Sequence, residues 1–182
     1  PMLRLMERAR AGEALGEDEL TQLFSARGDD CQHLLQLADE ARAESCGDTV
    51  SYVVNRNINY TNLCTYKCSF CAFSKGKTHE DLRGAPYVLD MSEVARRTEE
   101  AWRRGATEVC LQGGIHPAFT GQTYLEVLHA VKEAAPDMHV HAFSPLEVTQ
   151  GAKTLGIPLE NFLRQLKAAG LGTLPGTAAE IL

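Results

Sequence analysis

Three cysteines, Cys64, Cys68 and Cys71, stand close together in the spacing C-x3-C-x2-C. This spacing brings three thiolates together on one loop, and thiolates are the usual protein ligands of iron–sulfur clusters. A cube of four irons that is held by three cysteines keeps one iron without a protein ligand. That iron can bind a small molecule, as the open position of a catalytic zinc site does. The spacing therefore predicts a 4Fe–4S cluster that activates a ligand, with Cys64, Cys68 and Cys71 as the metal ligands.

A structural zinc site is the main alternative for these cysteines. Zinc takes four ligands, usually in two pairs, and no second C-x2-C or H-x3-H pair lies nearby, although His79 could serve as a fourth ligand. The other cysteines, Cys31, Cys46 and Cys110, are scattered, so a disulfide framework explains the set less well. Unliganded thiols are the third alternative.

Two further groups of candidate residues come at the ends of apolar segments. Gln112-Gly113-Gly114 ends one of them, and a glycine pair there lets the main chain approach a ligand closely, although such pairs are commonly simple turns. His139 and His141 are two residues apart, so on a strand they point to the same face. His141 is then a candidate for substrate binding or proton transfer, with a hydrogen-bonded core histidine as the alternative. A metal site formed by the two histidines is less favoured.

Polar residues also follow the histidines and lie near the end of the chain. Ser144 and Glu147 come shortly after His141, and either could cap a short helix. Glu180 follows Gly176-Thr177, where it could bond a ribose hydroxyl or face solvent. For Glu180 both interpretations stay open.

Alternating strand and helix patterns position these candidates. Residues 1–48 have the apolar spacing of helices and carry no chemically distinctive group, so they form a predicted helical extension. From residue 49, strand-like segments alternate with helical ones: strands at 50–60, 108–112, 138–143 and 171–174, and helices around 91–104, 124–135 and 159–169. Because parallel strands need such crossovers, residues 49–182 predict an α/β fold with about four βα units of a partial TIM barrel. The candidates then lie at the carboxyl ends of strands, where such folds place their active sites.

Charge and length narrow the classes of function. The 182 residues carry a net charge of −6, with no basic stripe, which argues against nucleic acids and anionic membranes as partners. No apolar run reaches the roughly 20 residues of a membrane span. We therefore predict a cytoplasmic protein that acts on small molecules. About four parallel strands do not close a barrel, and neither Pro1-Met2 nor Leu182 resembles a natural terminus, so we expect a truncated chain whose activity alone is in doubt.

The residues around the cysteines, Asn55–Asn62 before them and Ala72-Phe73 after them, resemble those of radical S-adenosylmethionine enzymes. In that superfamily an aromatic residue between the second and third cysteines, here Phe70, lies near the adenine of the cofactor. The turn at Gln112-Gly113-Gly114 corresponds to the one that receives the methionine amino group. The resemblance thus implies S-adenosyl-L-methionine at the open iron, with Ser144 and Glu180 as further cofactor-binding candidates, and formation of a 5′-deoxyadenosyl radical.

Within that superfamily the chain most resembles the second subunit, or second half, of FO synthase, on the segments 55–59, 111–117, 139–147 and 175–182. This resemblance implies a transferase that joins the 4-hydroxybenzyl group of tyrosine to 5-amino-6-(D-ribitylamino)uracil in coenzyme F(420) biosynthesis. It implies an electron donor and the first FO synthase subunit as partners. One alternative is an enzyme of the futalosine route to menaquinone, in which the last motif tends to read Pro-Gly-Gly-Gly rather than the Pro-Gly-Thr-Ala of residues 175–178. Another is a non-catalytic metal-binding fragment.

Overall fold

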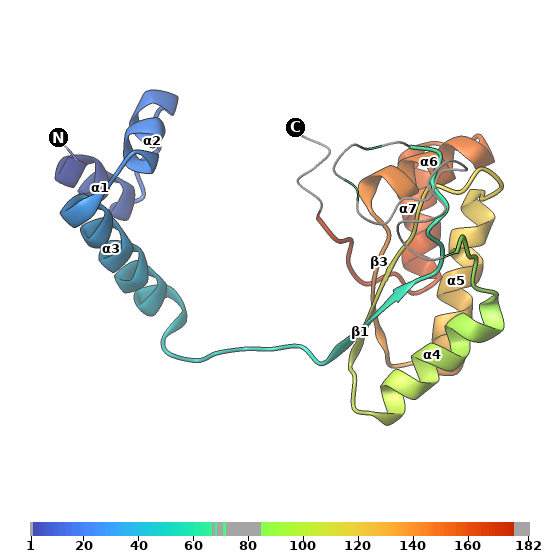
Figure 1. Ribbon diagram of the computed structural model, residues 1–182. Coiled ribbons are helices and arrows are strands. Elements are labelled where there is room, and N and C mark those ends of the chain that lie inside the picture. The colour runs from blue at the N-terminus through green and yellow to red at the C-terminus, as the bar shows by residue number, and fades with distance from the viewer. Residues whose placement is uncertain (1, 67, 69–70, 72–84, 177–182) are drawn as a thin grey trace. The chain divides into compact units, whose positions relative to one another are not determined.

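The computed structural model describes residues 2–66, 68, 71 and 85–176 (Figure 1). It divides the chain into two compact units, Pro1–Tyr52 and Val53–Leu182. The boundary predicted from the sequence, after residue 48, lies shortly before that division. In the described residues the first unit contains three helices, α1 (Met2–Arg10), α2 (Glu17–Phe24) and α3 (Gly28–Cys46).

The helical unit has a small core and many charged side chains. Met6 of α1 and Leu23 of α2 are both buried and belong to the same apolar cluster. Arg10 of α1 forms ion pairs with Glu40 and Glu44 of α3, at 2.6 and 2.5 Å. Exposed pairs of this kind contribute little to stability, so the short apolar stripes hold the three helices together.

The second unit is built from alternating strands and helices. Its strands β1 (Asn55–Asn59), β2 (Glu108–Gln112) and β3 (His139–Ala142) form a parallel sheet in the order β1-β2-β3. The helices are α4 (Met91–Arg103), α5 (Gly121–Ala134), α6 (Pro145–Leu155) and α7 (Leu159–Ala168). Each step from one strand to the next passes through a crossover helix, so the predicted α/β class with βα units is confirmed.

The two faces of this sheet differ in chemistry. One face, which we call the covered face, carries fully buried apolar side chains that pack against the helices: Ile58, Val109, Leu111, Val140 and Ala142. Figure 1 shows α4 to α7 together on one side of the strands. The other face, which we call the open face, carries side chains that are all at least partly exposed: Asn55, Asn57, Asn59, Glu108, Cys110, Gln112, His139 and His141. Strand alternation separates the two sets.

Two expectations about strands are wrong. Residues 50–54 are exposed and lie outside the sheet, and β1 starts only at Asn55. The apolar residues Val50, Tyr52 and Val53 suggested a strand, but the residues that pair with β2 are mostly polar because they line the open face. Likewise, 171–174 is not a fourth strand in the described part of the chain, since only Thr173 forms a parallel bridge, to His141. The helix expected after Gly176 lies outside the described residues.

The helix α4 begins at Met91, where the sequence predicted a helix. Asp90 is the N-cap, and its Oδ1 accepts a hydrogen bond from the N–H of Glu93 at 2.8 Å. The hydroxyl of Ser92 donates to the same Oδ1 at 2.6 Å. Within the described residues, no helix combines the length and apolar character that crossing a membrane requires.

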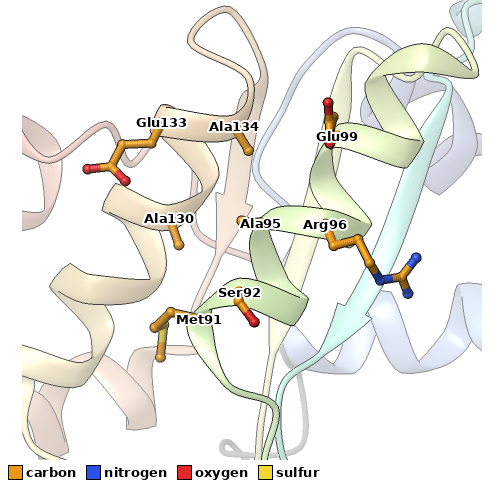
Figure 2. Close-up of a pocket in the computed structure, with 8 residues that line it drawn as sticks. All are labelled: Met91, Ser92, Ala95, Arg96, Glu99, Ala130, Glu133 and Ala134. Carbon is orange, nitrogen blue, oxygen red and sulfur yellow. The ribbon is translucent and has the colours of Figure 1, made fainter.

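A shallow groove runs between α4 and α5 (Figure 2). Apart from Met91, its lining consists of small or charged side chains from these two helices: Ser92, Ala95, Arg96, Glu99, Ala130, Glu133 and Ala134. None of the site residues predicted from the sequence lines it. The groove therefore belongs to the outer helical layer rather than to the strand ends.

Candidate functional site

The segments that follow β1 and β2 are bonded to each other at the carboxyl ends of the strands. The N–H of Gly114 donates to the carbonyl oxygen of Thr61 at 3.1 Å, and the N–H of Thr65 donates to the carbonyl oxygen of Ile115 at 2.8 Å. The N–H of Ile115 donates to Sγ of Cys64 at 3.3 Å, although the two residues are 51 positions apart in the sequence. The first cysteine and the glycine turn therefore lie side by side.

The packing of the chain itself requires glycine at positions 113 and 114. A Cβ atom at Gly113 would overlap the ring of Tyr60, and one at Gly114 would overlap the carbonyl group of Leu63 and Cβ of Cys64. The obstacle at Gly114 is main chain, which cannot rotate away as a side chain can. The close approach predicted from the glycine pair is thus present, and its partner here is the loop that carries Cys64. An approach to a cofactor stays a prediction.

The loop that carries the cysteines is anchored where it leaves the sheet and where it returns. The buried side chain of Asn62 donates from Nδ2 to the carbonyl oxygen of Ala85 at 3.1 Å and accepts at Oδ1 from the N–H of Tyr87 at 2.9 Å. The hydroxyl of Thr61 donates to the carbonyl oxygen of Tyr87 at 2.8 Å. Asn62 was absent from the predicted site. Its signal in the sequence was a polar residue two positions before the first cysteine.

The three clustered cysteines have free thiols, the type of ligand that iron–sulfur clusters use. Cys64 and Cys71 are half-buried, Cys68 is exposed, and none of the three is in a disulfide. The N–H of Cys71 donates to the carbonyl oxygen of Cys68 at 3.1 Å. The described residues contain no group of three histidine, cysteine or acidic side chains placed to hold a metal ion. The cluster therefore stays a prediction from the spacing and the chemistry of the thiols. Phe70 and His79 lie outside the described residues.

A buried acidic side chain lies next to the glycine turn. Glu147, at 1% exposure, accepts at Oε1 from the hydroxyl of Tyr60 and from the N–H of Gly113, the latter at 3.1 Å. Its Oε2 accepts from the N–H of Ser144 at 2.7 Å. Burial raises the pKa of Glu147, against the opposing effect of these hydrogen bonds, and burial with the nearby Glu147 charge raises the pKa of Tyr60 well above its usual value.

A strained residue at the end of β3 brings this acidic side chain into place. Phe143 has φ of 65°, in the left-handed region that costs a non-glycine residue about 1–3 kcal/mol. Its fully buried ring packs edge-on against Tyr124, with ring centroids 5.0 Å apart, and against Tyr60 at 6.2 Å. This packing holds the turn that directs Ser144 and the first turn of α6 toward Gly113.

The two histidines lie on the open face, with Val140 buried opposite them, as their spacing predicted. Nε2 of His139 and Nδ1 of His141 lie 3.0 and 2.6 Å from the hydroxyl oxygen of Thr173. His141 is half-buried in its row with Asn57 and Cys110, so a small molecule over the open face could reach it. A role in substrate binding or proton transfer stays a prediction.

The remaining predicted residues have simpler surroundings. Ser144 is the N-cap of α6, and its hydroxyl accepts from the N–H of Glu147 at 3.3 Å, so the capping alternative describes it. The half-buried Gln112 ends β2 on the open face, and its carbonyl oxygen accepts from the N–H of Tyr60 at 3.3 Å. Glu180 lies outside the described residues. Binding of a cofactor by these residues stays a prediction.

Solved structures share this fold. The FeFe-hydrogenase maturase HydG from Carboxydothermus hydrogenoformans matches with a TM-score of 0.63, over 95% of this chain and 47% of that chain. The sequence identity is 16%, so this likeness concerns the fold alone.

Curated relatives are similar in sequence but much longer. The FO synthase of Streptomyces coelicolor is 48% identical over 168 residues, which are 92% of this chain and 19% of that protein. The 5-amino-6-(D-ribitylamino)uracil--L-tyrosine 4-hydroxyphenyl transferase of Methanopyrus kandleri is 48% identical over 167 residues, which are 91% of this chain and 44% of that protein. The chain therefore spans about a fifth of the first relative and less than half of the second.

A family described as the Radical SAM superfamily matches residues 58–177. These residues include the cysteine motif, the glycine turn and the buried Glu147. Because the match runs through all three strand ends that form the candidate site, the chain belongs to the radical SAM superfamily.

Proposed function

We propose that the chain is the cluster-binding part of a radical S-adenosylmethionine transferase of the FO synthase type. The observation that carries this proposal is the contact of the Ile115 N–H with Sγ of Cys64. It brings the cysteine motif and the glycine turn, which are distant in the sequence, to one place at the strand ends. Such ends are where barrel folds of this kind place their active sites.

Cys64, Cys68 and Cys71 would hold three irons of a 4Fe–4S cluster, and S-adenosyl-L-methionine would bind at the fourth. The methionine ammonium group only donates hydrogen bonds, so the turn would receive it through main-chain carbonyl oxygens. The N–H of Gly113 is bound to Glu147. The proposed contacts to the cofactor come from these residues: Phe70, Gln112, Gly113, Gly114, Ser144 and Glu180.

The cluster, when bound and reduced, would supply one electron to the sulfonium, so that its bond to C5′ breaks and leaves methionine and a 5′-deoxyadenosyl radical. The electron would come from an external donor. The protein would orient the cofactor over the open face and keep water away from it. His141, half-buried on that face, would bind a polar substrate group or transfer a proton.

Tyrosine and 5-amino-6-(D-ribitylamino)uracil are the proposed substrates, and their joining through the 4-hydroxybenzyl group is the proposed reaction in coenzyme F(420) biosynthesis. The support is the identity of 48% to a transferase whose name contains both compounds. The first FO synthase subunit is the proposed protein partner. The chain spans only part of such relatives, so activity is first to be sought at the level of the cofactor.

The test starts with anaerobic reconstitution of the chain with iron and sulfide. We expect broad absorbance near 400 nm, and, with dithionite and S-adenosyl-L-methionine, formation of 5′-deoxyadenosine. Addition of tyrosine and the ribityl pyrimidine, with mass spectrometry of the products, then tests the substrates. Cys68→Ala should abolish cluster assembly, whereas Cys110→Ala, on the open face, should leave the iron content unchanged. One zinc per chain and no iron, or a folded protein that neither takes up iron nor cleaves the cofactor, would contradict the proposal.

A further inference from the structure

One carboxylate joins the carboxyl ends of all three strands. Glu147 binds Tyr60, which follows β1, Gly113, which follows β2, and Ser144, which follows β3. The Tyr60 contact spans 87 positions of the sequence and the Gly113 contact spans 34. A helix cap needs only the bond to Ser144, so capping leaves the other two unexplained.

We propose that Glu147 is a positioning residue that sets the main chain of the glycine turn and, through that turn, the loop of the first cluster cysteine. Its Oε1 holds the N–H of Gly113. The next two N–H groups of the same turn, those of Gly114 and Ile115, hold the carbonyl oxygen of Thr61 and Sγ of Cys64. Three consecutive N–H groups thus fix the turn on one side to the buried acid and on the other to the cysteine loop.

The ring of Tyr60 reinforces this arrangement. It is fully buried and occupies the space that a side chain at position 113 would need. Its hydroxyl donates to the same Oε1 that accepts from Gly113. A shift of Glu147 would therefore break both hydrogen bonds, the one from the Tyr60 hydroxyl and the one from the Gly113 N–H.

A carboxylate suits this position and an amide does not. All three partners of Glu147 donate, and two of them are main-chain N–H groups that cannot accept. A glutamine has one oxygen and one NH2 group, so its NH2 would face the N–H of either Gly113 or Ser144. One buried main-chain N–H would then lose its partner, and such a group is unfavourable to leave unpaired.

The test compares Glu147→Gln with Tyr60→Phe, which keeps the ring and removes one donor, and with Glu133→Gln, the same acid-to-amide change at an exposed position. Hydrogen–deuterium exchange of the full chain is followed at single amides by mass spectrometry with electron-transfer fragmentation. Iron content after anaerobic reconstitution and the thermal midpoint are measured on the same samples. The informative amides are those of Gly114 and Ile115, because neither bonds to Glu147.

In Glu147→Gln we expect the amides of Gly114 and Ile115 to exchange about tenfold faster, which corresponds to one lost buried hydrogen bond. Tyr60→Phe should give a smaller change in the same direction, and Glu133→Gln none. Buried amides of α5 should keep their protection. Unchanged exchange at Gly114 and Ile115 in Tyr60→Phe, together with unchanged exchange in a folded Glu147→Gln, overturns the proposal. If Glu147→Gln does not fold, Tyr60→Phe alone decides.

The part of this inference that concerns the cluster rests on the proposed function, while the exchange result does not. Faster exchange with a wild-type chain that never takes up iron would refute the proposed function and leave the positioning role standing. A wild-type chain that holds iron, with variants that exchange and retain iron as the wild type does, would refute the positioning role alone. Faster exchange and several-fold lower iron content in Glu147→Gln would support both.

Discussion

The covered face and the open face of the sheet come from the same strands, yet they are chemically opposite. Leu111 and Cys110 are neighbours in β2, and the first is fully buried among helices while the second is half-buried beside asparagine and histidine. Apolar burial is worth about 25 cal/mol per Å², so the covered face holds the unit together. The open face contributes polar groups that a packed core would exclude, and this makes it the side on which chemistry can take place.

The sharpest test of this contrast uses the two neighbours in β2. Leu111→Ala should lower the free energy of unfolding by about 2–5 kcal/mol, because it leaves a cavity in the core. Cys110→Ala should change it by less than about 1 kcal/mol, since it removes a small side chain from a partly exposed position. Urea unfolding, followed by circular dichroism, measures both. Similar losses in the two variants would show that the open face is packed as tightly as the covered one.

The glycine turn directly follows the carboxyl end of β2. We expect substitutions there to have the next largest effect on stability. In Gly114→Ala the new Cβ would overlap the Leu63 carbonyl group and Cys64. Overpacking of this kind costs about 1–3 kcal/mol, and the shift of the cysteine loop should also lower iron uptake after reconstitution.

Gly16→Ala is the matched control for that change. A Cβ there has only Oε2 of Glu19 within reach, at 3.8 Å, and the site lies in the helical unit. Gly16 is the N-cap of α2, where alanine is less favourable than glycine, so the unfolding free energy should fall by about 1 kcal/mol or less. The iron content should stay close to that of the wild type. Iron uptake by Gly114→Ala equal to that of the control would mean that the loop adapts to the extra carbon.

Periodicity predicted most of the covered face and its helices, because apolar residues recur at regular intervals along a helix face and a buried strand. Val94, Thr98 and Ala101 of α4 show the pattern, and their helix is where it was expected. The strand residues of the open face were harder to predict. Asn55–Asn59 is a strand whose only large apolar residue is Ile58, whereas the apolar residues just before it lie outside the sheet.

The buried acid could be predicted only in part. Ser144 and Glu147 have the S-x-x-E spacing of a capping box, and the box is present. The bonds to Tyr60 and Gly113 depend on how three strand ends meet, so no local pattern records them. The cysteine spacing, in contrast, is local, so the sequence alone predicts the candidate metal ligands.

Among the described residues, Glu147 departs from the separation of polar and apolar groups, since it is acidic and buried at the first turn of α6. Burial raises its pKa above the usual 4.5. Below the pKa that Glu147 has in the unfolded state, the side chain is protonated in both the folded and the unfolded state. Its contribution to the free energy of unfolding is then at its most favourable. As the pH rises toward the raised pKa of the folded state, the unfolded state gives up its proton more easily, and the contribution falls.

The difference in unfolding free energy between the wild type and Glu147→Gln should therefore decrease as the pH rises above the ordinary glutamate pKa of 4.5. Urea unfolding of both proteins at each pH measures it, and the histidines, common to both, cancel. A difference that grows with pH would mean that the three hydrogen bonds outweigh burial and hold the pKa low.

The smallest effect on the unfolding free energy is expected on the outer surface of the covering helices, where water solvates the charged side chains. Glu93 of α4 is held by hydrogen bonds from Arg96 first and from Arg97 next, both at 2.7 Å at their shortest, and these lower its pKa to about 2. Because the folded pKa is depressed, the contribution of Glu93 is present above pH 4.5 and is lost as the pH falls toward 2.

Solvent screens such exposed pairs, so Glu93→Gln should change the unfolding free energy far less than Leu111→Ala or Gly114→Ala. The carboxyl carbon shift of Glu93, followed by NMR over the acid range in which circular dichroism shows the fold intact, should titrate well below the other surface glutamates. High salt should move its midpoint back toward 4.5. A midpoint already near 4.5 at low salt would show that these ion pairs do not persist in solution. The outer helical layer would then owe its order to the covered face alone.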